Sequence, residues 1–131
     1  RTLQGENHMA TIIQTVDGVV ANRFQIKQAA LKFGRTSENQ VQIDDLAVSN
    51  EHARIISKTG DKGETSYFLE DLGSTNGSFI NEVKISRQQL HHKDNIRIGW
   101  NMFTFIDENE VNLEKTSKIK KSWIPGIYFS K

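Results

Sequence analysis

Closely spaced turn signals are the feature that most limits what this chain can fold into. From residue 10 to residue 107 they recur about every eight to twelve residues, and the stretches between them alternate apolar with polar residues. Asp17-Gly18 and Asn76-Gly77 are two such signals, because Asp-Gly and Asn-Gly pairs favour tight hairpin turns. Helical periodicity is almost absent from this region. The pattern predicts an all-β domain, built as an antiparallel sandwich or barrel.

The candidate strands are short and follow one another with few intervening residues. In chain order they read ATIIQTV, RFQIKQ, ALKFG, VQID, HARIIS, YFLEDL, SFIN, VKI, NIRIG and MFTFID. No internal repeat and no low-complexity tract interrupts them. Residues 9–107 are therefore expected to form a single domain.

Both ends of the chain depart from this pattern. Residues 1–8 lack periodicity and precede His8-Met9, a pair that resembles a cloning junction, so we expect a tag or a disordered N-terminus. Residues 108–131 are expected to be a non-strand tail or linker, with a marginal helix in their first part. The apolar cluster near the C-terminus has three open interpretations: it packs on the domain, pairs with another molecule, or leads into a further domain.

Composition excludes several classes of function. The chain has no cysteine, which excludes disulfides, thiol nucleophiles and cysteine-ligated metals and is compatible with the cytoplasm, the location we expect. No apolar run reaches the roughly 18 residues that a membrane span needs, so no membrane partner is expected. A net charge of +1 offers no large basic field for nucleic acid. Any bound anion must be held by a local cluster of residues.

Small polar residues and one arginine stand at the ends of three candidate strands. Arg35 follows FG, Ser49 and Asn50 precede HARII, and Thr75 and Asn76 lie in the turn after YFLEDL. If these loops meet at one end of a sandwich, they present a guanidinium, hydroxyls and amides around one point. A tetrahedral dianion such as a protein-bound phosphate is bound by those groups.

Each of these signals also has a purely structural explanation. A Gly-Arg pair is common, a Ser-Asn pair before a strand usually makes a local turn bond, and Asn-Gly usually marks a hairpin turn. Their order and spacing together favour a binding site.

Four motifs in this order resemble the forkhead-associated (FHA) domain family. They are FGR at 33–35, SNEH at 49–52, DLGSTNGSFIN at 71–81 and KDNIRIG at 93–99. The resemblance implies a two-sheet antiparallel β-sandwich of about eleven strands whose loops at one end bind phosphothreonine peptides. It further implies a phosphopeptide-binding module of a Ser/Thr kinase pathway, acting in signalling or assembly, with no enzymatic activity and no cofactor.

The resemblance also implies roles for individual residues. Arg35 and Ser49 would hold the phosphate with help from Asn50 and Thr75, and Asn76 would bond the peptide main chain. Three further residues would support the loops that carry this site, namely Gly34, His52 and Gly77.

Two departures from the family pattern limit what can be carried over. Asn81-Glu82 replaces the Asn-Gly pair common at that turn. The loop with Asp44, Asp45 and Ala47 differs where many members have a selective residue, so the preference for residues after the phosphothreonine is not carried over. Charge alone favours basic over acidic side chains there.

Other functions fit the sequence less well. A hydrolase built on Ser49, His52 and Asp45 is disfavoured, because side chains three apart at a strand start point in different directions and SNEH is no nucleophile elbow. The histidines lack metal-ligand spacing, so no metal site is expected. The alternative that stays open is a phosphate-independent protein-interaction or dimerisation module with the tail as its contact. The oligomeric state is not predicted.

Overall fold

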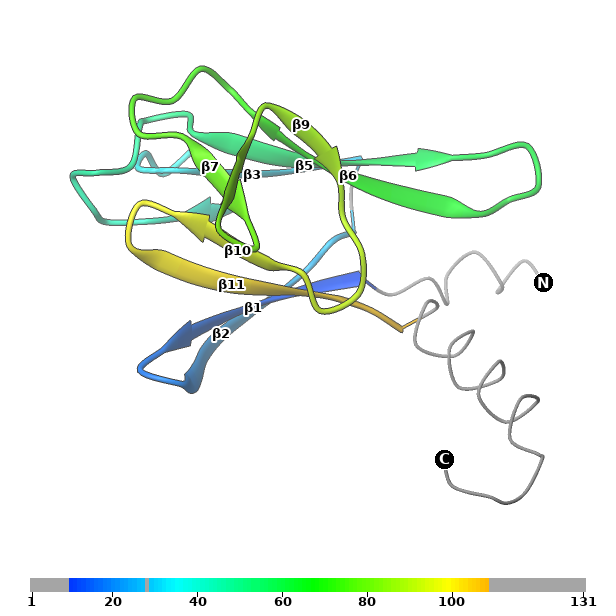
Figure 1. Ribbon diagram of the computed structural model, residues 1–131, viewed down its shortest axis with the longest axis horizontal. Helices are drawn as coiled ribbons and strands as arrows, with labels where there is room; N and C mark the ends of the chain where they lie inside the picture. The colour runs from blue at the N-terminus through cyan, green and yellow to red at the C-terminus, as the bar shows by residue number, and fades with distance from the viewer. Residues whose placement is uncertain (1–9, 28, 109–131) are drawn as a thin grey trace.

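The computed structural model describes residues 10–27 and 29–108, which form two facing β-sheets (Figure 1). The six-stranded sheet has the order β2-β1-β11-β10-β7-β8, and the five-stranded sheet has the order β4-β3-β5-β6-β9. The strands of the first are β1 (Ala10–Val16), β2 (Val19–Gln25), β7 (Ser78–Ile80), β8 (Val83–Ile85), β10 (Asn95–Ile98) and β11 (Asn101–Asp107). Those of the second are β3 (Ala30–Gly34), β4 (Val41–Gln42), β5 (Ala53–Thr59), β6 (Thr65–Asp71) and β9 (Arg87–Gln89). The predicted all-β sandwich of about eleven strands is confirmed.

The neighbouring strands pair antiparallel with one exception. Short β4 runs parallel to the end of β3, with Phe33 opposite Val41. The first and last strands, β1 and β11, lie side by side, and Ala10 pairs with Asp107. Both ends of the domain therefore meet at one place on the six-stranded sheet.

The core lies between the sheets and is built from alternate positions of each strand. Phe33 and Phe103 meet edge to face with ring centroids 5.3 Å apart, and both are fully buried. Ile12 pairs with Phe105 in the six-stranded sheet. Each such side chain contributes about 1.5–3 kcal/mol when it leaves water. This packing holds the strand ends, and the loops that leave them, in place.

The turn at Asn81-Glu82 forms despite the missing glycine. Both residues have positive φ angles, 51° and 68°, which are those of a two-residue hairpin turn. The Asn81 side chain is fixed by Asp94 and Asn95, since its amide donates to the Asp94 carboxylate and its oxygen accepts from the Asn95 N–H. Glu82 forms a 2.9 Å ion pair with Arg97. These contacts stabilise a backbone conformation that glycine would adopt without help.

The expected N-terminal tag at residues 1–8 lies outside the described residues. So does the expected tail at 108–131 with its candidate helix, except for Glu108. Within the described part, no helix has the length and hydrophobicity that a membrane crossing requires.

Candidate functional site

Three loops meet at one end of the sandwich, on the left of Figure 1. They connect β3 to β4, β4 to β5, and β6 to β7. The N–H of Arg35 donates to the Ser49 carbonyl over 3.1 Å, and the N–H of Thr75 donates to Ser49 Oγ over 3.1 Å. Ser49 therefore joins the other two loops, and the predicted gathering of Arg35, Ser49 and Thr75 is present.

The guanidinium of Arg35 is held by one backbone bond. Its Nε donates to the Val48 carbonyl over 3.1 Å, and the side chain is half-buried. Within the described part of the chain, no acceptor is bonded to its two terminal nitrogens. The cation is thus positioned against the β4–β5 loop with donors still available.

Gly34 allows these loops to approach each other. A Cβ atom there would lie 2.1 Å from the Asn50 carbonyl oxygen and 2.6 Å from Asn39 Nδ2, closer than any side chain tolerates. The Asn39 amide donates to that same carbonyl over 2.8 Å and is itself buried. Only glycine fits, so the supporting role predicted for Gly34 has a steric basis. Asn39 was missed by the sequence analysis because no motif marks it.

His52 is fully buried beneath the site and bonds the backbone of two loops. Its Nδ1 accepts from the Ser49 N–H over 3.0 Å, and its Nε2 lies 2.8 Å from the Gly77 carbonyl. A carbonyl can only accept, so Nε2 is the donor of this bond while Nδ1 is the acceptor of the other. Because both nitrogens are engaged with backbone, the ring is not aligned to deprotonate the Ser49 hydroxyl. This geometry argues against the hypothesis that Ser49 and His52 form a hydrolase site.

The remaining predicted residues lie at the rim. Asn50, Thr75 and Asn76 are exposed, and the Asn76 amide donates to the Ala47 carbonyl over 2.8 Å. Gly77 has φ of +88°, a conformation that favours glycine, and its N–H donates to Ser74 Oγ. All eight predicted site residues therefore belong to the three loops or to the strand ends beside them.

Asp71 organises the β6–β7 loop and was also missed by the sequence analysis. Its carboxylate accepts bonds from the N–H groups of Gly73 and Ser74 and from the hydroxyls of Ser74 and Ser78. Burial disfavours the charged carboxylate, but the hydrogen bonds from Ser74 and Ser78 outweigh it, so the pKa of Asp71 is lowered. An aspartate two residues before the Gly-Ser pair is a recognisable turn signal.

We expect this carboxylate to make the domain sensitive to acid. A lowered folded-state pKa means that the stabilisation is complete above the unfolded-state value of about 3.9 and is lost as the pH falls through the folded-state pKa. Asp71→Asn should lower the melting temperature at pH 7, and its deficit relative to wild type should shrink below about pH 4. Thermal melts across this range, with exposed Asp61→Asn as the control, measure the effect. A deficit for Asp71→Asn that stays constant with pH would contradict it.

Asp45 lies in the loop where the sequence allowed no carry-over. Its carboxylate accepts from the N–H groups of Ala47 and Trp100 and from the Asn101 amide. The Ala47 bond is the main reason that the pKa of Asp45 is lowered, opposed by burial and assisted by the other two bonds. Asp45 thus ties the β4–β5 loop to the β10–β11 turn. These donors are neutral, so Asp45 keeps its negative charge, and the expected preference for basic side chains in a partner still rests on both Asp44 and Asp45.

Exposed apolar side chains flank the polar centre of the site. Leu46 is 90% exposed and Trp100 is 82% exposed, although both are large. Trp100 borders a hollow of about 320 Å³ whose lining includes Ala47, Asn76 and Phe79. Exposed apolar groups beside polar ones are typical of interaction surfaces.

Comparison with known families identifies this architecture. The FHA domain model matches residues 31–99, more than half of the chain. This chain belongs to the FHA domain family. The matched residues of this FHA domain include all four motifs, namely FGR, SNEH, STNG and KDNIRIG.

Two proteins of known name share part of the sequence of this FHA domain. The transcriptional regulatory protein EmbR of Mycobacterium tuberculosis is 36% identical over 63% of this chain and 20% of its own length. The oxoglutarate dehydrogenase inhibitor of Corynebacterium glutamicum is 30% identical over 64% of this chain and 55% of its own length. The chain thus spans about a fifth of one relative and about half of the other.

Solved structures agree with the sequence matches. EmbR in complex with a low-affinity phosphopeptide has a TM-score of 0.65 and 32% identity, covering 76% of this chain and 24% of EmbR. A structure from work on phosphothreonine-dependent FHA domain interactions has a TM-score of 0.65 and 26% identity, covering 75% of this chain and 95% of its own.

Proposed function

We propose that this FHA domain is a phosphopeptide-binding module that recognises phosphothreonine on partner proteins, in signalling or assembly downstream of Ser/Thr kinases. The observation that carries this proposal is the Arg35 guanidinium, held by the Val48 carbonyl beside Ser49 with its terminal donors available. Charge-assisted bonds from arginine to phosphate are among the strongest that side chains make. The phosphopeptide complex of the relative EmbR supports the same ligand class.

Ser49 and its neighbours complete the proposed phosphate site. Ser49 Oγ already accepts from the Thr75 N–H, so its own proton is free to be donated to a phosphate oxygen. Asn50 and the Thr75 side chain are exposed at the same rim and supply further polar groups. A cation with hydroxyl and amide donors matches the three oxygens of a phosphate.

Asn76 is proposed to bond the main chain of the peptide. Its Nδ2 has two hydrogens, of which one is donated to the Ala47 carbonyl. The second hydrogen and the side-chain oxygen remain for one donor and one acceptor of an extended peptide. The bond to Ala47 holds the amide in place before the peptide arrives.

We expect a preference for phosphothreonine over phosphoserine in otherwise identical peptides. The family resemblance implies a small apolar niche for the threonine methyl group, and burial of one such group contributes about 0.8 kcal/mol, roughly fourfold in affinity. Titration calorimetry with both phosphopeptides and the unphosphorylated threonine peptide measures this. Equal affinity for the two phosphopeptides would argue for a different anion site.

The same titration separates the proposal from its alternative. A phosphate-independent interaction or dimerisation module would bind the unphosphorylated peptide as well as the phosphorylated one. The tail that would make its contact lies outside the described residues.

Cytoplasmic location is proposed on the absence of cysteines and the kinase-dependent ligand. Fractionation of cells that make the native protein tests it, and recovery outside the cytoplasm would contradict it.

A further inference from the structure

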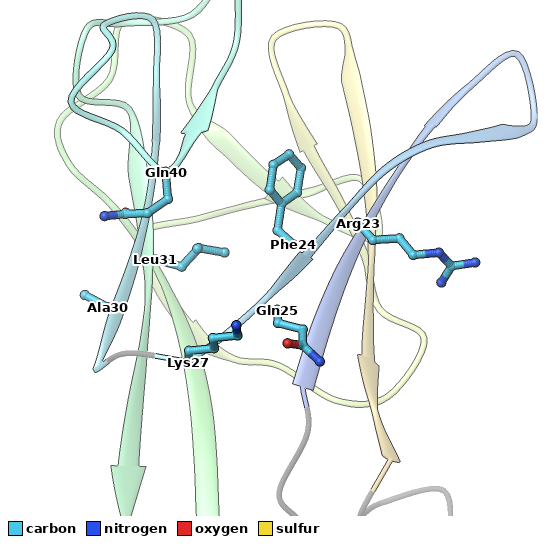
Figure 2. A pocket seen from close by; sticks show the side chains of 7 residues that line it. All are labelled: Arg23, Phe24, Gln25, Lys27, Ala30, Leu31 and Gln40. Carbon is cyan, nitrogen blue, oxygen red and sulfur yellow. The ribbon is translucent and has the colours of Figure 1, made fainter. Parts of the chain in front are cut away.

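The two sheets are joined along one side of the sandwich and separate along the other. On the joined side, β8 continues into β9 through Ser86 alone. On the other side, β2 is the outermost strand of its sheet, and β4 covers only the end of β3. A groove of about 440 Å³ lies there between β2 and β3 (Figure 2).

The floor of this groove is apolar. The side chains of Phe24 and Leu31 lie between the two strands in Figure 2, and the small residue Ala30 of β3 also belongs to the lining. Leu31 is buried and Phe24 packs against the core while remaining partly exposed. The groove is therefore a place where an added apolar side chain would leave water.

Along the groove, the outer edge of β2 has no neighbouring strand among the described residues. The Ile26 N–H donates to the Ala10 carbonyl on β1. Because backbone groups alternate in direction along a strand, those of Arg23 and Gln25 face away from β1. Such an edge is a template for a further strand.

On the β3 side, a side chain of the protein itself occupies the position that a neighbouring strand would take. The Lys32 N–H donates over 2.8 Å to Gln40 Oε1, a side-chain oxygen that stands where the carbonyl of a neighbouring strand would accept. Gln40 itself lines the groove. The β3 edge is thus partly capped by the protein, and the β2 edge is the one left open.

The charge of the groove indicates which partner fits. Lys27 and Arg23 line it, both are exposed, and neither forms an ion pair within the described residues. Among the residues that the structure describes, none of those that line the groove is acidic. A second copy of this chain would bring the same cations together across the β2 edges, whereas acidic side chains would be attracted.

We propose that this groove binds an extended, acidic segment of a partner protein, which adds a strand to the outer edge of β2 and inserts an apolar side chain over Phe24 and Leu31. None of the proposed phosphate-binding residues lines the groove, so this contact is independent of phosphothreonine recognition. Main-chain bonds would give affinity, and the alternating side chains would give specificity.

The test uses two unphosphorylated peptides with the same apolar pattern, EVELEVE and KVKLKVK. In NMR titrations of the full chain, EVELEVE is expected to shift the amides of Arg23 and Gln25, and KVKLKVK is not. Lys27→Glu should weaken EVELEVE binding roughly tenfold, because it replaces an attraction with a repulsion. Lys62→Glu, on the exposed β5–β6 hairpin, makes the same change of charge outside the groove and should leave binding unchanged.

Two further variants test the main-chain contact at β2 and the independence of this contact from the phosphate site. Gln25→Pro removes an outward N–H but no bond to β1, so it should abolish EVELEVE binding with little loss of stability. Arg35→Ala should bind EVELEVE like wild type. Equal shifts by both peptides, no shift at the β2 amides, or retained binding in Gln25→Pro would overturn the proposal. Self-association in sedimentation experiments that Gln25→Pro removes would assign the edge to a second copy and overturn it too.

Discussion

Arg35→Ala is expected to weaken binding of a phosphothreonine peptide about ten- to hundredfold while the domain stays folded. A charge-assisted hydrogen bond contributes about 1.5–3 kcal/mol, which corresponds to this loss. The guanidinium makes one bond inside the protein, from Nε to the Val48 carbonyl, so its removal should cost little stability. Titration calorimetry and thermal melting of the same preparations measure both quantities.

Two further variants sharpen this result. Arg35→Lys keeps the charge but not the paired donors, so its affinity should fall between those of wild type and Arg35→Ala. Arg87→Ala removes an exposed guanidinium from β9, the edge strand of the five-stranded sheet that lies opposite β4, where it contacts Glu70 and Phe68 and none of the predicted site residues, and it should bind normally. If Arg35→Ala kept wild-type affinity, the phosphate site would have to lie elsewhere.

His52→Ala is expected to lower stability more than any other substitution at the site that leaves the backbone unstrained. It removes both ring bonds and leaves the Ser49 N–H and the Gly77 carbonyl without their partner in the interior. Each unsatisfied group costs about 1–3 kcal/mol, and each kcal/mol lowers the melting temperature by about 4–8 °C for a domain of this size. Phosphopeptide affinity should fall as well, because the ring holds the loop that carries Ser49.

The same variant separates a binding module from an enzyme. Gln88→Ala, at an exposed position on β9, is the control and should melt close to wild type. Wild type should show no phosphatase or esterase turnover. A His52→Ala protein with wild-type melting and lost hydrolytic activity would mean that the ring is a general base and that the proposed function is wrong.

Local features of the sequence determined the class of fold and most of the proposed site. Alternation and turn pairs depend on neighbouring residues, which is why the strands around Phe33 or Phe103 could be predicted without coordinates. The order of the motifs predicted Arg35 and Ser49 as site residues, and in the structure their loops lie together. The supporting role expected for His52 is explained by its two backbone bonds.

Tertiary structure alone decided how the strands pair and which polar groups stabilise the loops. Nothing in the alternation of β1 or β11 indicates that they are neighbours, because every strand edge offers the same backbone donors and acceptors. From the sequence, Asp45 was interpreted as a loop charge and as a member of a disfavoured hydrolase set, and Asp71 had no role of its own, yet each carboxylate accepts bonds from residues brought close by folding. Whether a polar side chain faces solvent or braces a loop depends on what lies opposite it, and the packing of the two sheets decides that.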